Sequence, residues 1–383
     1  MSFIRVLFVL SGKGISGAEY VLLDTLKYLS DIQCCFFINE KNEKLINEIK
    51  KSNISDKIYI GDLVIPYSRT SRFITAPIEM LLYRKKLANL SLLNRIKNDY
   101  DIIYLNNTIE VLSFPFEFFN ARVIAHIHDM VDSIRPAARY LLKERLKKVD
   151  HIISVSDAVK NSLVKIGVEE RKITTIYNYV MPEEPTYSNS IKIPKYISLR
   201  KIRIGFIGDM IKRKGPDILA KACLELEKKI EKEIIVDFIY KNYDMKIVKY
   251  IKDISIYGKN TNYCLLGAVN RQNLLERYKE YDLIVVPSRR DPLPTVILEA
   301  LKKRIIVVAS EVDGIPEIIP EKIFLFKKGD YKDLADKISR LVSYPYGYVL
   351  DKMRNVLDFY DNTFTKERKI NKINHLFENC LRK

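Results

Sequence analysis

In the last third of the chain, an apolar run, a loop with an acidic residue and a helical stretch follow one another. Residues 281–287 (YDLIVVP) predict a buried strand, 288–294 (SRRDPLP) a loop and 295–302 (TVILEALK) the next helix. Such a succession is typical of a parallel α/β sheet, whose carboxyl edge binds ligands and whose helix amino termini attract phosphate. Asp291 and Glu299 are therefore candidate ligand contacts, although two solvated carboxylates would give the same pattern.

Apolar runs and helical stretches also alternate along the rest of the chain, which predicts two α/β doubly wound units. The first unit opens with a strand at 4–10, a glycine-rich loop and a helix at 20–29. Residues 182–199 contain three prolines and little periodicity, as expected of a connection between domains, and a strand at 202–207 opens the second unit. The other expected strands are 34–38, 102–105, 123–127, 151–155, 234–240, 262–266, 283–286, 305–309 and 323–326.

The composition excludes several classes of protein. A chain of 383 residues with 47% hydrophobic residues can form two cores, and five cysteines at unrelated spacings indicate a reducing cytosol instead of a disulfide framework. The four histidines form no ligand motif, so no metal site is expected. The net charge of +17 favours a polyanionic partner, namely nucleic acid, acidic lipid or a phosphorylated substrate. No motif for reading nucleic acid is visible, and nucleic acid is not the expected partner.

Residues 281–319 resemble the nucleotide-sugar site of glycosyltransferase family 4. The similarity comprises an acid, seven intervening residues and Glu299, then an apolar strand and the sequence GIPE at 314–317. Members of that family are retaining enzymes of the GT-B fold, in which two Rossmann-like doubly wound domains face a central cleft. The resemblance implies an acceptor-binding domain at 1–180, a linker at 181–200, a nucleotide-sugar-binding domain at 201–360, and a carboxyl-terminal helix at 361–383 that crosses back to the first domain.

The segment 204–215 (IGFIGDMIKRKG) resembles the family motif of glycine, arginine and lysine, which brings two cations to the diphosphate. Lys214 and Gly215 match this motif. Asp209 follows Gly208 where the family usually has the arginine, so the strength of leaving-group stabilisation is open. A second positive charge would have to come from Lys212, Arg213, Arg289 or Arg290, or be absent.

The resemblance also assigns roles around the acidic pair. Glu299 would hold the ribose hydroxyls, since a carboxylate can accept two hydrogen bonds from a vicinal diol, and Asp291 would contact the donor sugar. The family more often has glutamate at the position of Asp291, and the shorter side chain is expected to affect which sugar is accepted. The amides of Thr295, Val296 and Ile297 would meet the diphosphate. The other donor-binding residues implied are Gly17, Gly208, Arg213, Gly215, Gly267, Val269 and Leu293.

Residues 11–19 (SGKGISGAE) contain a GxGxxG pattern between a strand and a helix, so a dinucleotide site is one interpretation. No acidic residue closes the following strand at 34–38, and Glu40 is the nearest candidate. Residues 16–19 are more similar to the glycine, glycine, alanine and glutamate run with which the family lines its cleft. The cleft interpretation is favoured, with Ser16 and Glu19 as acceptor contacts.

Polar residues follow two further strands of the first domain. Asn106 and Asn107 could contact the acceptor, and stabilising a turn is an equal alternative. His128 matches the family histidine that points at the donor sugar, which implies a polar contact and not a nucleophile or metal ligand; taken alone, it would be read as a structural histidine. Asn178 is similar to the family asparagine at the domain hinge.

Together these features predict a retaining, metal-independent glycosyltransferase with Lys214, Asp291, Glu299 and His128 as its central residues. It would move a sugar from a nucleotide-diphosphate donor to a sugar hydroxyl of a lipid-linked glycan or glycolipid, with no cofactor besides that donor substrate. A GT-B epimerase, a phosphorylase-like enzyme, an NAD enzyme and a nonenzymatic polyanion-binding protein are the alternatives.

The expected location is the cytoplasm. Residues 69–97 contain seven basic residues and one acid, so this segment either touches the inner face of an anionic membrane or packs on the sheet with a solvated basic face.

Overall fold

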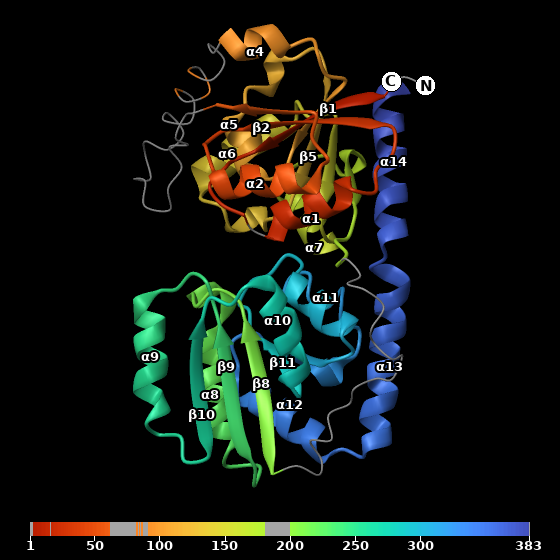
Figure 1. Cartoon of the computed structure of the whole chain (residues 1–383). Helices are drawn as coiled ribbons and strands as arrows, with labels where there is room; N and C mark the ends of the chain where they lie inside the picture. Colours follow the sequence, from red (N-terminus) through yellow and green to blue (C-terminus); the bar gives the residue numbers. More distant parts are fainter. Residues whose placement is uncertain are drawn as a thin grey trace. The chain divides into compact units, whose positions relative to one another are not determined.

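The computed structural model describes residues 3–15, 17–61, 91–180 and 200–382, together with Leu82, Arg84 and Lys86 (Figure 1). The chain divides into two compact units. Unit 1 comprises Met1–Met181 and Lys366–Lys383, and unit 2 comprises Pro182–Thr365. Each unit is built around one parallel sheet.

The sheet of unit 1 has the strand order β3-β2-β1-β4-β5-β6-β7. Its strands are β1 (Ile4–Leu10), β2 (Ile32–Ile38), β3 (Lys57–Ile60), β4 (Ile102–Leu105), β5 (Arg122–Ile127), β6 (His151–Ser154) and β7 (Ile173–Thr175). Its helices are α1 (Gly17–Leu26), α2 (Glu43–Ser52), α4 (Ser91–Ile96), α5 (Thr108–Ser113), α6 (Pro136–Leu146), α7 (Asp157–Lys165) and α14 (Lys366–Arg382). Because the strand order reverses between β1 and β4, their carboxyl ends form the edge where such sheets bind ligands.

Helix α14 belongs to the core of unit 1 although it is the last element of the chain. Its apolar side chains Ile373, Leu376 and Phe377 are buried in one cluster with residues of β1, β2, α1 and α2. The ring of Phe377 lies edge-on to Tyr104 of β4, with the centroids 6.2 Å apart. The burial of this apolar stripe fixes α14 to the sheet.

The sheet of unit 2 has the strand order β10-β9-β8-β11-β12-β13, with its reversal between β8 and β11. Its strands are β8 (Lys201–Ile207), β9 (Glu233–Ile239), β10 (Thr261–Gly267), β11 (Leu283–Val286), β12 (Ile306–Ser310) and β13 (Leu325–Phe326). Its helices are α8 (Pro216–Leu226), α9 (Met245–Ser255), α10 (Arg271–Arg277), α11 (Thr295–Lys302), α12 (Tyr331–Ser343) and α13 (Tyr346–Thr363). Figure 1 shows α9 beside β10 at one side of this sheet, with α10 near β11 and α11 beyond it at the other side.

The expected strands are present, with two differences. The run at 323–326 is a strand only at Leu325–Phe326, because Lys322–Phe324 forms a 3₁₀ turn. Strands β3 and β7 were not predicted, since β3 begins with a lysine after a polar loop and β7 has only three residues. The basic segment at 69–97 lies outside the described residues up to position 90, apart from three single residues, and α4 follows.

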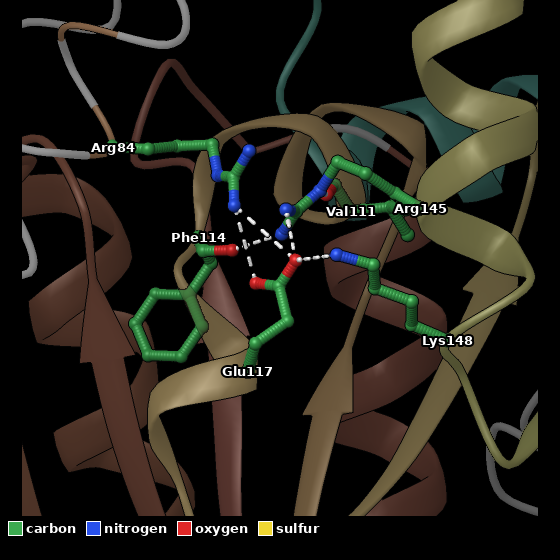
Figure 2. A network of polar contacts seen from close by, with 6 residues as sticks. All are labelled: Arg84, Val111, Phe114, Glu117, Arg145 and Lys148. Atoms are coloured by element: carbon green, nitrogen blue, oxygen red, sulfur yellow. Dashed lines mark hydrogen bonds and ion pairs between the residues drawn. The ribbon is translucent and has the colours of Figure 1, made fainter.

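A network around one carboxylate joins α6 to the segment after α5 (Figure 2). Glu117 accepts from Arg145 at 2.7 Å and from Arg84 at 3.2 Å, and Lys148 lies 3.6 Å away. The guanidinium of Arg145 also donates to the carbonyls of Val111 and Phe114, and the side chain is only 2% exposed. Burial works against an ionised Glu117, but Arg145 and Arg84 outweigh it, so the pKa of Glu117 is lowered.

We expect Arg145→Met to destabilise unit 1 by about 3 kcal/mol, because it removes a buried cation from a carboxylate and from two backbone carbonyls. Thermal unfolding followed by circular dichroism should show a fall in Tm of roughly 6–12 °C. Arg122→Met is the matched control, since Arg122 and Asp150 form an ion pair at 3.0 Å that is partly exposed. Such a pair contributes at most about 1 kcal/mol, so equal shifts in both variants would contradict the expectation.

Candidate active site

Two loops meet at the carboxyl edge of the unit 2 sheet, one after β8 and one after β11. Gly215 has φ = +73°, and a Cβ at this position would lie 1.9 Å from the carbonyl oxygen of Pro287. Only glycine allows this close approach of two backbones. The amide of Arg289 also donates to the carbonyl of Arg213 at 2.7 Å. The second sequence-predicted glycine, Gly208, has φ = +152°, so it too favours glycine.

This meeting of loops brings Lys214 to Asp291, which lies 77 residues away in the sequence. Lys214 Nζ is 2.8 Å from Asp291 Oδ2, and Ser288 Oγ donates to the same oxygen at 3.0 Å. Asp291 is 3% exposed, so its carboxylate depends on these partners. A phosphate group arriving at Lys214 would compete with Asp291 for the ammonium.

The backbone of Asp291 ties this pair to the turn after β12. Its amide donates to Asp313 Oδ2 at 2.8 Å, and its carbonyl accepts from the amide of Gly314 at 3.2 Å. Asp313 itself has φ = +45°, an uncommon conformation that a short polar side chain tolerates. The GIPE segment that carries part of the family resemblance is thus a support of the Asp291 loop.

Asp209, which stands where the family usually has arginine, has a structural role. Its Oδ1 accepts from the backbone amide of Asn242 at 3.2 Å and from the side-chain amide at 3.0 Å. These bonds join the loop after β8 to the loop after β9. Asp209 therefore stabilises the loop after β8. As an acid, it cannot supply the positive charge of the family arginine.

The arginines that could supply the second positive charge differ in their surroundings. Arg289 forms a two-point ion pair with Asp217, at 2.7 and 2.8 Å. Arg290 Nε lies 3.5 Å from Asp313 Oδ2. Arg213 is exposed and donates to the carbonyl of Arg290 at 3.2 Å. Because a carbonyl leaves the charge of Arg213 uncompensated, we favour Arg213 over the other two arginines as the second cation.

Helix α11 begins beside this pair. Thr295 and Val296 are partly exposed at its first turn, and Leu293 is buried before it. The expectation that the amide of Ile297 meets a diphosphate is wrong, because this N–H donates to the carbonyl of Pro294 at 3.1 Å. The amides of Thr295 and Val296 therefore remain as the groups of this turn that could donate hydrogen bonds to an anion.

Glu299 lies on the next turn of α11 and is 9% exposed. The hydroxyl of Tyr278 donates to its Oε2 at 2.8 Å, and Arg271 Nη1 lies 3.7 Å from its Oε1. Sequence reasoning missed both partners, since no spacing rule connects them to Glu299. Two of the implied donor-binding residues precede the helix that carries Arg271: Gly267 ends β10 with φ = +69°, and partly buried Val269 follows.

In unit 1, the glycine loop after β1 also passes close to the backbone of a neighbouring loop. Gly12 has φ = +79°, and a Cβ there would lie 1.8 Å from the carbonyl oxygen of Glu40. Gly17 begins α1, and Glu19 is buried in its first turn. Ser16 lies outside the described residues. Gly12 therefore has a steric reason that requires no dinucleotide.

The two asparagines after β4 behave differently. Asn107 caps α5, with its Oδ1 accepting from the amide of Thr108 at 2.8 Å, so the turn-stabilising role applies to it. Asn106 is 1% exposed, and neither polar atom of its side chain has a hydrogen-bond partner among the residues that the structure describes. A buried amide without partners suits a hydroxyl-rich ligand at this edge.

Two histidines pack together at the carboxyl end of β5: His126, which is buried in the strand, and His128, which follows it and is partly buried. The rings of His126 and His128 are 4.0 Å apart between centroids, and the hydroxyl of Tyr104 is 2.7 Å from His126 Nδ1. Burial, with a contribution from the nearby Lys369, lowers the pKa of His128 to about 3. The imidazole is therefore neutral at physiological pH and suits a hydrogen bond better than an ion pair.

The sequence did not predict two further features of unit 1, a contact of Asn178 and the burial of Glu110. Asn178, expected at a hinge, accepts from Lys369 of α14 at 3.2 Å within unit 1. Glu110 of α5 is 1% exposed, and burial, together with the charges of Glu19 and Asp129, raises its pKa to about 8. An acid three residues after the helix cap could have been noted in the sequence, but its burial could not.

Comparison with known proteins agrees with this arrangement. Residues 15–184 match the family described as Glycosyltransferase Family 4, and residues 190–358 match Glycosyl transferases group 1. The chain belongs to glycosyltransferase family 4. Its two parallel-sheet units are those of the GT-B fold.

The relatives of this family-4 chain span several glycan classes. It is 25% identical over 218 residues to the phosphatidylinositol N-acetylglucosaminyltransferase GPI3 subunit of Saccharomyces cerevisiae, covering 55% of the chain and 47% of that protein. The chain thus spans about half the length of the first curated relatives it matches. It is 23% identical over 325 residues to the capsular polysaccharide biosynthesis glycosyltransferase CapH of Staphylococcus aureus, covering 82% and 83%.

Among solved structures, Anabaena HepE in complex with UDP-glucose superposes with a TM-score of 0.76 and 16% identity, covering 98% of this chain and all of that one. At this identity the likeness concerns the fold. Within the described ranges, no group of three or more His, Cys, Asp or Glu side chains could hold a metal ion. None of the helices described is long and apolar enough to cross a membrane.

Proposed function

We propose that this chain is a retaining glycosyltransferase that transfers a hexose-type sugar from a nucleotide-diphosphate donor to a sugar hydroxyl of a cell-envelope glycan. The observation that carries the proposal is the meeting of Lys214 and Asp291 at 2.8 Å, beside the first turn of α11. An ammonium and two open amides are suited to a diphosphate, and a buried carboxylate next to them is suited to sugar hydroxyls. Glu299 on the same helix would hold the ribose.

In the proposed reaction, the acceptor hydroxyl attacks the anomeric carbon on the face from which the diphosphate leaves. The bond between the anomeric carbon and the diphosphate oxygen breaks, and a leaving phosphate oxygen takes the acceptor proton. Lys214, Arg213 and the α11 amides stabilise the charge that develops on the diphosphate, so the proposal requires no metal. Asp291, already paired with Lys214, orients the sugar and does not act as a nucleophile.

Unit 1 would bind the acceptor, with Asn106 and Glu19 as hydroxyl contacts and neutral His128 as a polar contact to the sugar. The names of the relatives support glycan chemistry, since CapH serves capsular polysaccharide and the GPI3 subunit glycosylates phosphatidylinositol. A lipid-linked acceptor fits both the net charge of +17 and a peripheral position at the inner face of the cell membrane. All five cysteines are free thiols, as suits the cytoplasm.

A thermal-shift panel tests the proposal. Nucleoside diphosphates and their sugar derivatives are added singly to the purified chain, with NAD and a DNA oligonucleotide for comparison. We expect one nucleotide series to raise Tm, because a ligand that binds only the folded form stabilises it by mass action. No shift with any nucleotide, together with salt-sensitive DNA binding, would favour a polyanion-binding protein instead. Consumption of the nucleotide sugar by isomerisation, without acceptor, would indicate an epimerase.

A further inference from the structure

Tyr278 is the buried partner of the carboxylate that the proposed function assigns to the ribose. It lies in the 3₁₀ turn Tyr278–Glu280, which follows α10, and its side chain is fully buried. Its hydroxyl donates to Glu299 Oε2 at 2.8 Å, a good distance for a charge-assisted hydrogen bond. Burial, and then the charge of Glu299, raises the pKa of Tyr278 well above its ordinary value, so the phenol stays a donor.

Glu299 has a competing partner on its other oxygen. Arg271 Nη1 lies 3.7 Å from Oε1, a distance at which a small rotation of the carboxylate would produce a tight ion pair. The Tyr278 hydroxyl opposes that rotation, because it holds Oε2 in place. An ionised carboxylate offers about four acceptor positions, so a bond from Tyr278 to Oε2 is compatible with the binding of a diol.

We infer that Tyr278 is a positioning residue for the nucleotide, which fixes the Glu299 carboxylate in the orientation that accepts the two ribose hydroxyls. This inference rests on the proposed function and adds a selectivity to it: the site distinguishes ribonucleotides from nucleotides without ribose hydroxyls through Tyr278. The tyrosine touches Glu299 and not the ligand. Its effect must therefore disappear when the ligand lacks the diol.

The test is the affinity of ADP, CDP, GDP and UDP and of their 2′,3′-dideoxy counterparts, measured by titration calorimetry on the full chain. We expect the wild type to bind one ribonucleotide at least tenfold more tightly than its dideoxy form. Tyr278→Phe removes only the hydroxyl, and we expect it to lower that preference about tenfold, or about 1.4 kcal/mol, by weakening the ribonucleotide alone. Unchanged affinity for the dideoxy form shows that the variant is folded.

Tyr281→Phe is the matched control. The hydroxyl of Tyr281 is also buried and donates to a buried carboxylate, but that carboxylate is Asp237, whose Oδ2 lies at 3.2 Å, and not Glu299. It should leave the preference for ribose unchanged. If Tyr278→Phe binds both forms as the wild type does, the inference is wrong and the proposed function stands. If no nucleoside diphosphate binds the wild type, or if the wild type binds the ribo and dideoxy forms equally, the proposed role of Glu299 itself is wrong.

Discussion

Replacing Glu299 by alanine is expected to lower kcat/KM for the nucleotide-sugar donor by about two to three orders of magnitude. The substitution removes the carboxylate that accepts from the ribose diol, and two charge-assisted hydrogen bonds together contribute about 3–4 kcal/mol. It also leaves the buried hydroxyl of Tyr278 without its acceptor. Initial rates of transfer to a glycan acceptor, measured over a range of donor concentrations, give kcat/KM for the donor.

The control for this variant is Glu276→Ala, which removes an exposed glutamate from neighbouring α10. We expect its kinetics to match the wild type. If a folded Glu299→Ala enzyme had near-normal kcat/KM, the proposal that the nucleotide binds at Glu299 would be wrong.

Replacing Lys214 by alanine is expected to reduce kcat by about 10²–10³, because the developing charge on the diphosphate loses its nearest cation. The effect on kcat should exceed the effect on KM, since the charge on the bridging oxygen grows only as the bond breaks. Steady-state initial rates over a range of donor concentrations give kcat and KM separately. Asp291 loses its ion pair in this variant, so the melting temperature has to be recorded beside the rates.

Lys201→Ala provides the comparison for Lys214. Lys201 also belongs to an ion pair, with Glu233 at 3.0 Å, but it begins β8 and thus lies at the opposite edge of the sheet from the loop that follows this strand. Equal kinetics in the two lysine variants would show that Lys214 is an ordinary structural lysine.

Much of the fold could be predicted from the sequence, because its parallel strands are buried and read as continuous apolar runs. Residues 283–286 and 102–105 coincide with β11 and β4. Residues 323 and 324 of the 3₁₀ turn are predicted as strand for the same reason: they are apolar and satisfy the pattern without forming the ladder. Short β3 was missed because its polar start gives no such run.

The residue types of the candidate site were also visible, but their partners were not. The contact of Lys214 with Asp291 and that of Tyr278 with Glu299 depend on the order of the strands, which no local spacing encodes. The use of the Ile297 amide by Pro294 depends on turn geometry. Sequence patterns identify the groups that a sheet edge carries, and the tertiary structure decides which of them bind each other.

Asp209 illustrates the same limit. Its departure from the family pattern was evident, yet its bonds to Asn242 explain why an acid is tolerated there. These bonds connect two loops where the family usually has a cation, so under the proposed function Lys214 would carry a larger share of the diphosphate charge.

A crystal structure of the chain with the nucleoside diphosphate that gives the largest thermal shift is the most direct measurement. We predict that the diphosphate lies within hydrogen-bond distance of Lys214 Nζ and of the Thr295 and Val296 amides, with both ribose hydroxyls on Glu299. A diphosphate bound elsewhere, with the pair of Lys214 and Asp291 undisturbed and Glu299 unoccupied, would contradict the account.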